Sequence, residues 1–231
     1  MRISIIIPVY NEATLIGDLV AYLRQHGGAA VQEIWVSDGG STDDTVAIAQ
    51  AAGALVLHSP QKGRAFQMNV AAAQAKGEVL YFVHADTLPP THFATDILQA
   101  VEEGYGLGRY RSRFNTRNWL MKLNAWFTRF DWFVCLGGDQ SLFVTKALFQ
   151  QTGGYNPSYL IMEEYEFCGR AKQLARYKIF TATVLISTRK YEGRSWWQVQ
   201  RANYKAVQMF KQGAPQQQIV ETYKQLLRYR S

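Results

Sequence analysis

Short apolar runs alternate with amphipathic segments along the first part of the chain. Residues 3–9 form a continuous, β-branched apolar run, which is typical of a strand buried on both faces. Apolar residues then recur at helical spacing over 14–25, before a Gly-Gly pair. Further strands are expected at 34–37, 55–58 and 79–84, with helices at 42–52 and 62–76. This alternation predicts a three-layer, Rossmann-like α/β/α fold with a mostly parallel central sheet.

The pattern loosens after residue 86. The later strands are expected at 105–113, 140–145 and 178–186, and the later helices at 91–103, 116–131 and 164–175. The tail from residue 196 predicts two helices that break around 213–215. We therefore expect a single domain over residues 1–195 and a C-terminal helical extension over 196–231.

The composition is that of an ordinary globular protein. The 231 residues are 48% hydrophobic and 19% charged, which excludes a disordered chain. A domain of this size buries enough surface to fold without a disulfide or a structural metal. Cys135 and Cys168 lie among apolar neighbours, which favours buried thiols in a reducing compartment, and the sparse cysteines and histidines do not match a zinc site.

The most apolar later stretch, residues 119–136, is interrupted by charged side chains and does not predict a membrane-spanning helix. The apolar run at the amino terminus is interrupted too soon to be a signal peptide, so we expect a cytoplasmic protein. The stretch is rich in aromatic residues: Trp119, Trp126, Phe127, Phe130, Trp132 and Phe133. These predict core packing or a homodimer surface. With their flanking arginines and lysines they also suit a helix at the inner face of an anionic membrane, and this alternative stays open.

The net charge of +7 favours acidic partners such as nucleotides, an anionic membrane surface or nucleic acid. Nucleic acid is disfavoured, because the basic residues are scattered and no reader motif is present. A dinucleotide-dependent dehydrogenase is disfavoured as well, because Gly-x-Gly-x-x-Gly does not follow the first strand.

Polar side chains follow three of the expected strands. Asn11 and Glu12 come after the first strand, Asp38 after the second, and His84 and Asp86 after the fourth. The carboxyl ends of parallel strands meet at one edge of the sheet, so these residues should line one crevice. Several carboxylates there would repel a phosphate ligand unless a divalent cation lay between them. Mg²⁺ and Mn²⁺ accept carboxylate and phosphate oxygens together, so the crevice predicts such a cation.

The motifs at these strand ends are Ile-Pro-Val-Tyr-Asn-Glu, Ser-Asp-Gly-Gly-Ser-Thr-Asp-Asp-Thr and His-Ala-Asp-Thr. A second block contains Gly138-Asp139-Gln140, Gly153-Gly154-Tyr155 and the run from Met162 to Phe167. Together they resemble family 2 glycosyltransferases, which have the glycosyltransferase A fold. The features around His84 and Asp139 also resemble a small bacterial subgroup associated with arsenosugar biosynthesis. The resemblance implies a nucleotide-binding half at about 1–90 and an acceptor-side half at about 91–195.

The resemblance also implies which residues bind the donor. Asp38 would accept a hydrogen bond from the nucleotide base, commonly uracil, and Asp86 would bind Mn²⁺ or Mg²⁺. His84 stands where the family has the first acid of its Asp-x-Asp motif, and it would ligate the metal or contact ribose or phosphate. The remaining donor-binding candidates are Pro8, Tyr10, Asn11, Glu12, Arg64, Asn69 and Ala85.

Inverting transfer requires a carboxylate that takes the proton of the acceptor hydroxyl. The family usually has Glu-Asp at the position where this chain has Glu163-Glu164, so Glu164 is the expected base and Glu163 the alternative. Asp139 and Gln140 would lie near the acceptor hydroxyl, and Trp196 offers an aromatic face to a sugar ring. The segment 189–192 resembles one that lies near the diphosphate or the acceptor in relatives, and a solvated strand end is its alternative reading.

These features predict an inverting, metal-dependent glycosyltransferase that uses a nucleotide diphosphate sugar, with UDP the expected nucleotide. The acceptor would be a hydroxyl of a small molecule or of a lipid-linked sugar. The alternative is a sugar-nucleotide-binding protein without catalytic activity, and its support is the Glu-Glu pair in place of Glu-Asp.

Overall fold

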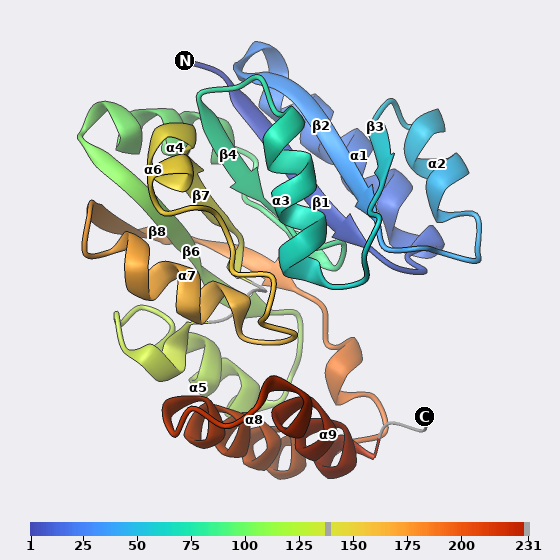
Figure 1. The fold of residues 1–231 in the computed structure, drawn as a ribbon, viewed down its shortest axis with the longest axis vertical. Helices are drawn as coiled ribbons and strands as arrows, with labels where there is room; N and C mark the ends of the chain where they lie inside the picture. The colour runs from blue at the N-terminus through green and yellow to red at the C-terminus, as the bar shows by residue number, and fades with distance from the viewer. Residues whose placement is uncertain (137–139, 229–231) are drawn as a thin grey trace.

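The computed structural model describes residues 1–136 and 140–228 (Figure 1). The strands are β1 (Ile3–Val9), β2 (Val31–Asp38), β3 (Leu55–His58), β4 (Val79–Phe82), β5 (Thr87–Leu88), β6 (Tyr105–Phe114), β7 (Leu142–Thr145) and β8 (Arg176–Ile186). The helices are α1 (Ala13–Gly27), α2 (Thr45–Ala51), α3 (Arg64–Gln74), α4 (Phe93–Glu102), α5 (Trp119–Phe127), α6 (Lys146–Gln151), α7 (Glu163–Ala171), α8 (Trp196–Lys211) and α9 (Gln216–Leu227). Short 3₁₀ turns cover Gly28–Ala30, Phe133–Cys135 and Arg189–Tyr191.

The strands form a single mixed sheet in the order β3-β2-β1-β4-β7-β6-β8-β5. Strands β3, β2, β1 and β4 are parallel, as the alternating pattern predicts. The order of the remaining strands brings in antiparallel pairs, because β7 runs against both β4 and β6, and β5 runs against β8. The expected α/β class is confirmed, and the sheet is parallel mainly in its first half.

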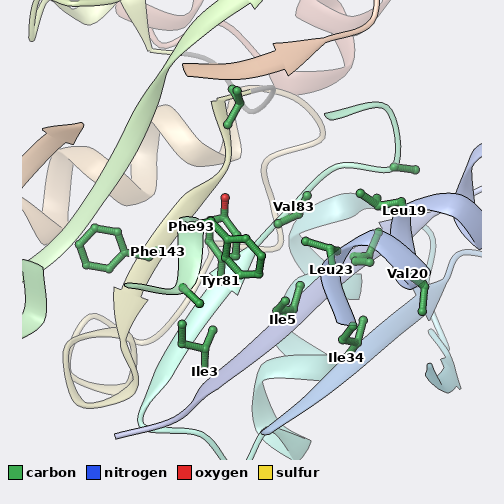
Figure 2. Close-up of a cluster of buried hydrophobic side chains, with 14 of the residues drawn as sticks. Ile3, Ile5, Leu19, Val20, Leu23, Ile34, Tyr81, Val83, Phe93 and Phe143 are labelled. Carbon is green, nitrogen blue, oxygen red and sulfur yellow. The ribbon is translucent and has the colours of Figure 1, made fainter. Parts of the chain in front are cut away.

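Two apolar cores lie on opposite faces of this sheet. One core packs α1, α2 and α4 against the strands and contains Ile5, Leu23, Val83 and Phe93 (Figure 2). The other core packs α3, α6 and α7 against the opposite face and contains Phe82. The three-layer arrangement follows from β-branched strands that are apolar on both sides.

The two C-terminal helices lie against each other at one end of the molecule, beyond the sheet (Figure 1). They contact the segment before α7 through a separate apolar cluster that includes Met162, Met209 and Ile219. The extension therefore supports the start of α7. In the part of the chain that the structure describes, no helix combines the length and hydrophobicity that crossing a membrane requires.

Several expected boundaries are wrong. The second helix begins at Thr45 and not at 42, because the Asp43 carboxylate accepts a hydrogen bond from the Thr45 amide (3.1 Å) in a tight turn ahead of it. Helix α5 is shorter than expected, and of its residues Met121 is the buried one. The prediction that these aromatic residues pack in the core is therefore wrong for Trp119, Trp126 and Trp132, which are exposed. Helix α6 and the short strand β5 were not anticipated.

Candidate active site

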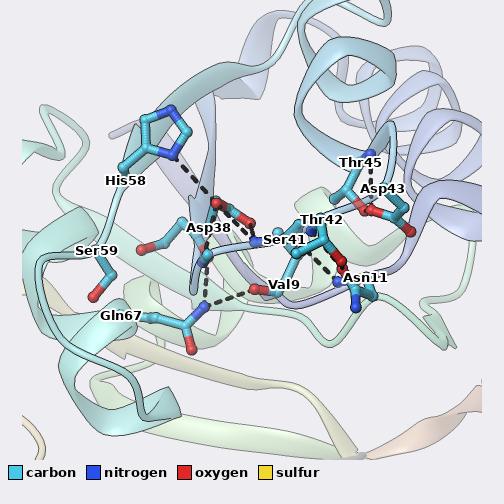
Figure 3. Close-up of polar contacts among 12 residues, drawn as sticks. Val9, Asn11, Asp38, Ser41, Thr42, Asp43, Thr45, His58, Ser59 and Gln67 are labelled. Carbon is cyan, nitrogen blue, oxygen red and sulfur yellow. Dashed lines mark hydrogen bonds and ion pairs between the residues drawn. The ribbon is translucent and has the colours of Figure 1, made fainter.

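The loops after β1 and β2 are bonded to each other at the carboxyl edge of the sheet (Figure 3). The Asn11 amide donates to Ser41 Oγ (2.9 Å), and Asn11 Oδ1 accepts a hydrogen bond from the Thr42 amide (2.8 Å). Asn11 has a φ of 55°, in a left-handed region that asparagine tolerates better than most residues. Ser41 thus fixes the loop of Asn11, and the N-cap residue of α2 is Asp44. Asn11 thus shapes this edge through contacts within the protein.

Asp38 lies at the end of β2 and is 1% exposed. Its carboxylate accepts hydrogen bonds from the amides of Gly40 (3.1 Å) and Ser41 (3.0 Å), and it lies 3.2 Å from His58 Nδ1. Burial alone would raise the pKa of Asp38, but these hydrogen bonds outweigh burial and hold it below its usual value. An ionised, fixed acceptor at this strand end suits a ligand with N–H donors, such as a nucleotide base.

Gln67 is a structural residue of the site that sequence reasoning missed. Its side chain is buried, and Nε2 donates to the carbonyls of Val9 and Ser37, both at 2.8 Å (Figure 3). It therefore ties the ends of β1 and β2 together beside Asp38. A Cβ on Gly39 would lie 2.9 Å from Gln67 Nε2, so the loop comes close to this amide only because residue 39 is glycine.

The first turn of α7 carries two adjacent buried carboxylates, each with a basic partner from another element. Glu163 is 0% exposed, and its Oε1 lies 2.8 Å from Arg64 Nε at the start of α3. Glu164 is 7% exposed, and its Oε1 lies 3.0 Å from His84 Nε2 just beyond β4. The helix N-terminus further favours negative charge at both positions.

The two carboxylates differ in their acidity. Burial raises the pKa of Glu163 to about 7, although the Arg64 guanidinium opposes this effect. Burial also acts on Glu164, but the hydrogen bond to His84 and the charges of His84 and Arg64 hold its pKa below the usual value. Glu164 is therefore ionised near neutral pH, where Glu163 is only partly ionised, so the Glu164 carboxylate is available to accept a proton.

The residue before this pair has an unusual backbone. Met162 adopts the left-handed conformation, with φ 63° and ψ 24°, at the N-cap of α7. Such a conformation costs about 1 kcal/mol or more in a residue other than glycine, and it persists where the surroundings hold it. Met162 is buried against α8 and α9, so the C-terminal extension holds the turn that aims Glu163 and Glu164.

Glu12 and Asp86 share a cationic neighbour. Arg189, in the 3₁₀ turn after β8, donates from Nη1 and Nη2 to the two Glu12 carboxylate oxygens, both at 2.7 Å. Arg189 Nη2 also lies 3.8 Å from Asp86 Oδ2. Glu12 and Asp86, which sequence reasoning assigned to the donor, thus meet at one guanidinium. Of the segment 189–192, Arg189 therefore contacts this edge.

A divalent cation fits this donor set through Asp86. Within residues 1–136 and 140–228 there is no group of three or more His, Cys, Asp or Glu residues that could hold a metal ion. A protein-only cage is therefore not formed by them. Mg²⁺-type sites commonly use one or two carboxylates with substrate phosphates as the other ligands, and the partly exposed Asp86 matches that arrangement. His84 has its Nε2 engaged with Glu164, so it is placed as a partner of the carboxylate.

The remaining expected site residues have different surroundings. Pro8 and Ala85 are buried at the strand ends, while Tyr10 is exposed. The Asn69 amide is bonded on both sides to the main chain of Tyr155, with 2.7 Å to its carbonyl and 2.9 Å to its amide, which gives Asn69 a packing role. Gln140 is buried and donates to the Cys135 carbonyl (2.8 Å). Asp139 lies outside the described residues.

Trp196, expected at the acceptor, opens α8 and packs edge-to-face on Trp197, with ring centroids 4.7 Å apart. Its indole Nε1 is buried and has no hydrogen-bond partner among the described residues. Trp196 lies at the start of the C-terminal extension.

The family model for Glycosyl transferase family 2 matches residues 4–153. The chain belongs to this family. A glucosyl-3-phosphoglycerate synthase from Mycolicibacterium smegmatis is 32% identical over 96 residues, which cover 38% of this chain and 32% of that protein. The chain thus matches about a third of the length of the curated relatives of this kind.

Solved structures share the fold. The mannosyltransferase PcManGT from Pyrobaculum calidifontis, in complex with GDP-Man and Mn²⁺, has a TM-score of 0.69 at 19% identity, covering 98% of this chain and 68% of that chain. Glucosyl-3-phosphoglycerate synthase from Mycobacterium tuberculosis, in complex with Mn²⁺, UDP and glucosyl-3-phosphoglycerate, has a TM-score of 0.61 at 18% identity, covering 100% of this chain and 81% of that chain. The expected glycosyltransferase A architecture is confirmed.

Proposed function

We propose that this protein is an inverting glycosyltransferase that moves a sugar from a nucleotide diphosphate donor to a hydroxyl acceptor, with UDP as the nucleotide. The observation that carries the proposal is the contact between His84 and Glu164 at 3.0 Å. It joins the strand end that bears Asp86 to the helix that bears the ionised carboxylate. A donor site and a proton acceptor therefore lie next to each other, as direct displacement requires.

In this proposal the donor lies along the carboxyl edge of β1, β2 and β4. Asp38 accepts a hydrogen bond from the base. Asp86 would hold a divalent cation, which would neutralise the charge that develops on the leaving diphosphate. The relatives solved with Mn²⁺ together with UDP or GDP-Man support a cation and a nucleotide diphosphate for this fold. Arg189 adds a guanidinium at the same place, suited to phosphate oxygens.

Glu164 serves as the base on the acceptor side. The acceptor oxygen forms a bond to the anomeric carbon while the bond from that carbon to the diphosphate oxygen breaks, and the hydroxyl proton passes to Glu164. His84 holds this carboxylate in place and in its ionised form. Glu163, with its raised pKa and its Arg64 partner, positions the start of α7 and does not take the proton.

The proposal is tested by calorimetric titration of UDP into the protein with and without Mn²⁺. We expect UDP binding to the wild type to require Mn²⁺. In Asp86→Ala, UDP binding should no longer depend on Mn²⁺, and in Asp38→Asn the affinity for UDP should be lower. Asp18→Ala removes an exposed carboxylate on α1 and serves as the matched control, which should bind as the wild type does. Failure of UDP and of other nucleoside diphosphates to bind with any divalent metal would overturn the proposal. Binding without any turnover across an acceptor panel would instead favour a sugar-nucleotide-binding protein.

A further inference from the structure

A groove separates the loop after α6 from the turn between α8 and α9. Its volume is about 620 Å³, within the range of about 300–1,000 Å³ that is typical of small-molecule sites. Its polar and aromatic lining comes from Asn156, Ser158, Tyr159, Phe210, Gln216 and Gln217. The C-terminal extension therefore supplies one wall of the groove, and the segment that leads into α7 supplies the other.

The groove is fixed in shape by contacts between its two walls. Gln216 Oε1 accepts hydrogen bonds from the amides of Leu160 (3.2 Å) and Ile161 (3.4 Å). The rings of Tyr159 and Phe210 pack together with centroids 5.6 Å apart. A preformed cleft orders fewer groups on binding than a flexible surface does, and so it loses less entropy.

The lining carries no charge, although the chain as a whole has a net charge of +7. The described residues that form the groove include no Asp, Glu, Lys, Arg or His. A neutral ligand suits such a lining, whereas a phosphate or nucleotide suits the charged edge around Asp38 and Arg189. The Gln217 amide is exposed on α9 and has no hydrogen bond to another described residue, so it can both donate and accept.

Amide groups beside half-buried aromatic rings match the chemistry of a sugar. Hydroxyl groups pair with amides, and the apolar faces of sugar rings pack on aromatic rings. The groove is also close to the expected base. Leu160 lines it, and the four-residue step to Glu164 spans at most about 14 Å even when fully extended.

We propose that this groove binds a neutral oligosaccharide, as the part of the acceptor that lies away from the reacting hydroxyl. The inference rests on the proposed transferase function, and it assigns the C-terminal extension a role in acceptor choice. An acceptor with several sugar units would occupy the groove and the space beside Glu164 at once. A small acceptor without further sugar units would occupy only the space beside Glu164.

The test is saturation-transfer NMR with a panel of neutral trisaccharides: maltotriose, cellotriose, mannotriose and chitotriose. Gln217→Lys places a cation in the groove. Gln218→Lys places the same cation at the next exposed position of α9, which does not line the groove. Tyr159→Leu keeps apolar bulk but removes the ring. We expect at least one trisaccharide to bind the wild type and Gln218→Lys alike, with affinity weakened about tenfold in Gln217→Lys and Tyr159→Leu.

The proposal is overturned if no trisaccharide of the panel binds the wild type, or if Gln217→Lys and Gln218→Lys bind equally well. UDP titration with Mn²⁺ on the same samples separates this failure from failure of the transferase function. Intact UDP binding without saccharide binding rejects the groove alone. Saccharide binding without UDP binding rejects the transferase function and leaves the groove as a saccharide site.

Discussion

Removing the Arg189 guanidinium should raise the affinity of the nucleotide-free protein for Mn²⁺. Arg189 pairs with both Glu12 carboxylate oxygens at 2.7 Å and lies 3.8 Å from Asp86 Oδ2. A divalent cation on Asp86 would therefore lie next to a positive charge. In Arg189→Ala this repulsion is absent, and the Glu12 carboxylate also becomes available to attract the cation.

The size of the effect follows from the exposure of the pair. The Arg189 side chain is 46% exposed, so water screens much of the interaction, and we use the upper end of the values measured for exposed ion pairs, about 1 kcal/mol. This free energy corresponds to an affinity about fivefold higher. The effect should shrink as salt is added, because exposed charges are screened.

The assay is electron paramagnetic resonance of free Mn²⁺ during titration of the protein. Arg117→Ala removes an exposed arginine in the loop before α5, so it controls for the change in net charge. We expect tighter Mn²⁺ binding in Arg189→Ala than in both the wild type and Arg117→Ala. Equal or weaker binding in Arg189→Ala would refute the placement of the cation beside Arg189.

Three further predictions concern other residues. Glu164→Gln should lower the turnover number by about a hundredfold or more while UDP affinity changes little, whereas unchanged turnover would exclude Glu164 as the base. Burial raises the pKa of Glu163 from 4.5 to about 7 against the opposing charge of Arg64, so the folded state holds an extra proton between these values and loses stability as the pH rises through them. Thermal unfolding midpoints of Glu163→Gln should lack this decline, and parallel curves for variant and wild type would contradict the reasoning. Asn69→Ala should lower the free energy of unfolding in urea by about 2 kcal/mol, because two main-chain groups of Tyr155 lose their partners, and UDP affinity should persist. If Asn69→Ala kept full stability but lost affinity for UDP, Asn69 would instead be a donor-binding residue.

Much of the fold can be predicted from local pattern. The β-branched run at Ile3–Val9 and the alternation that follows it indicate the parallel half of the sheet. A strand is expected at 140–145, but the antiparallel pairing of β7 with β4 and β6 could not be foreseen, because these partners are chosen by the packing of distant segments. Helix α6 is only six residues long and gives too short a periodic signal to detect.

The sequence marks candidate residues for the site, but it does not give the contacts between them. Asp38 and Asp86 lie at the ends of buried strands, and this position identifies them as candidate site residues. The pairing of Glu12 with Arg189 joins residues 177 positions apart, and the pairing of His84 with Glu164 joins residues 80 positions apart. No local pattern carries such information. Gln67 gave no signal either, because a polar residue on an amphipathic helix is ordinarily taken to face solvent.

The proposed transferase function requires that a nucleotide diphosphate and a divalent cation bind at the carboxyl edge of β1, β2 and β4. A crystal structure of the protein with Mn²⁺ and UDP, with anomalous data collected at the manganese edge, tests it most directly. We expect one strong anomalous peak at Asp86, with the uracil ring beside Asp38. A manganese peak away from Asp86, or UDP bound away from Asp38, would contradict it.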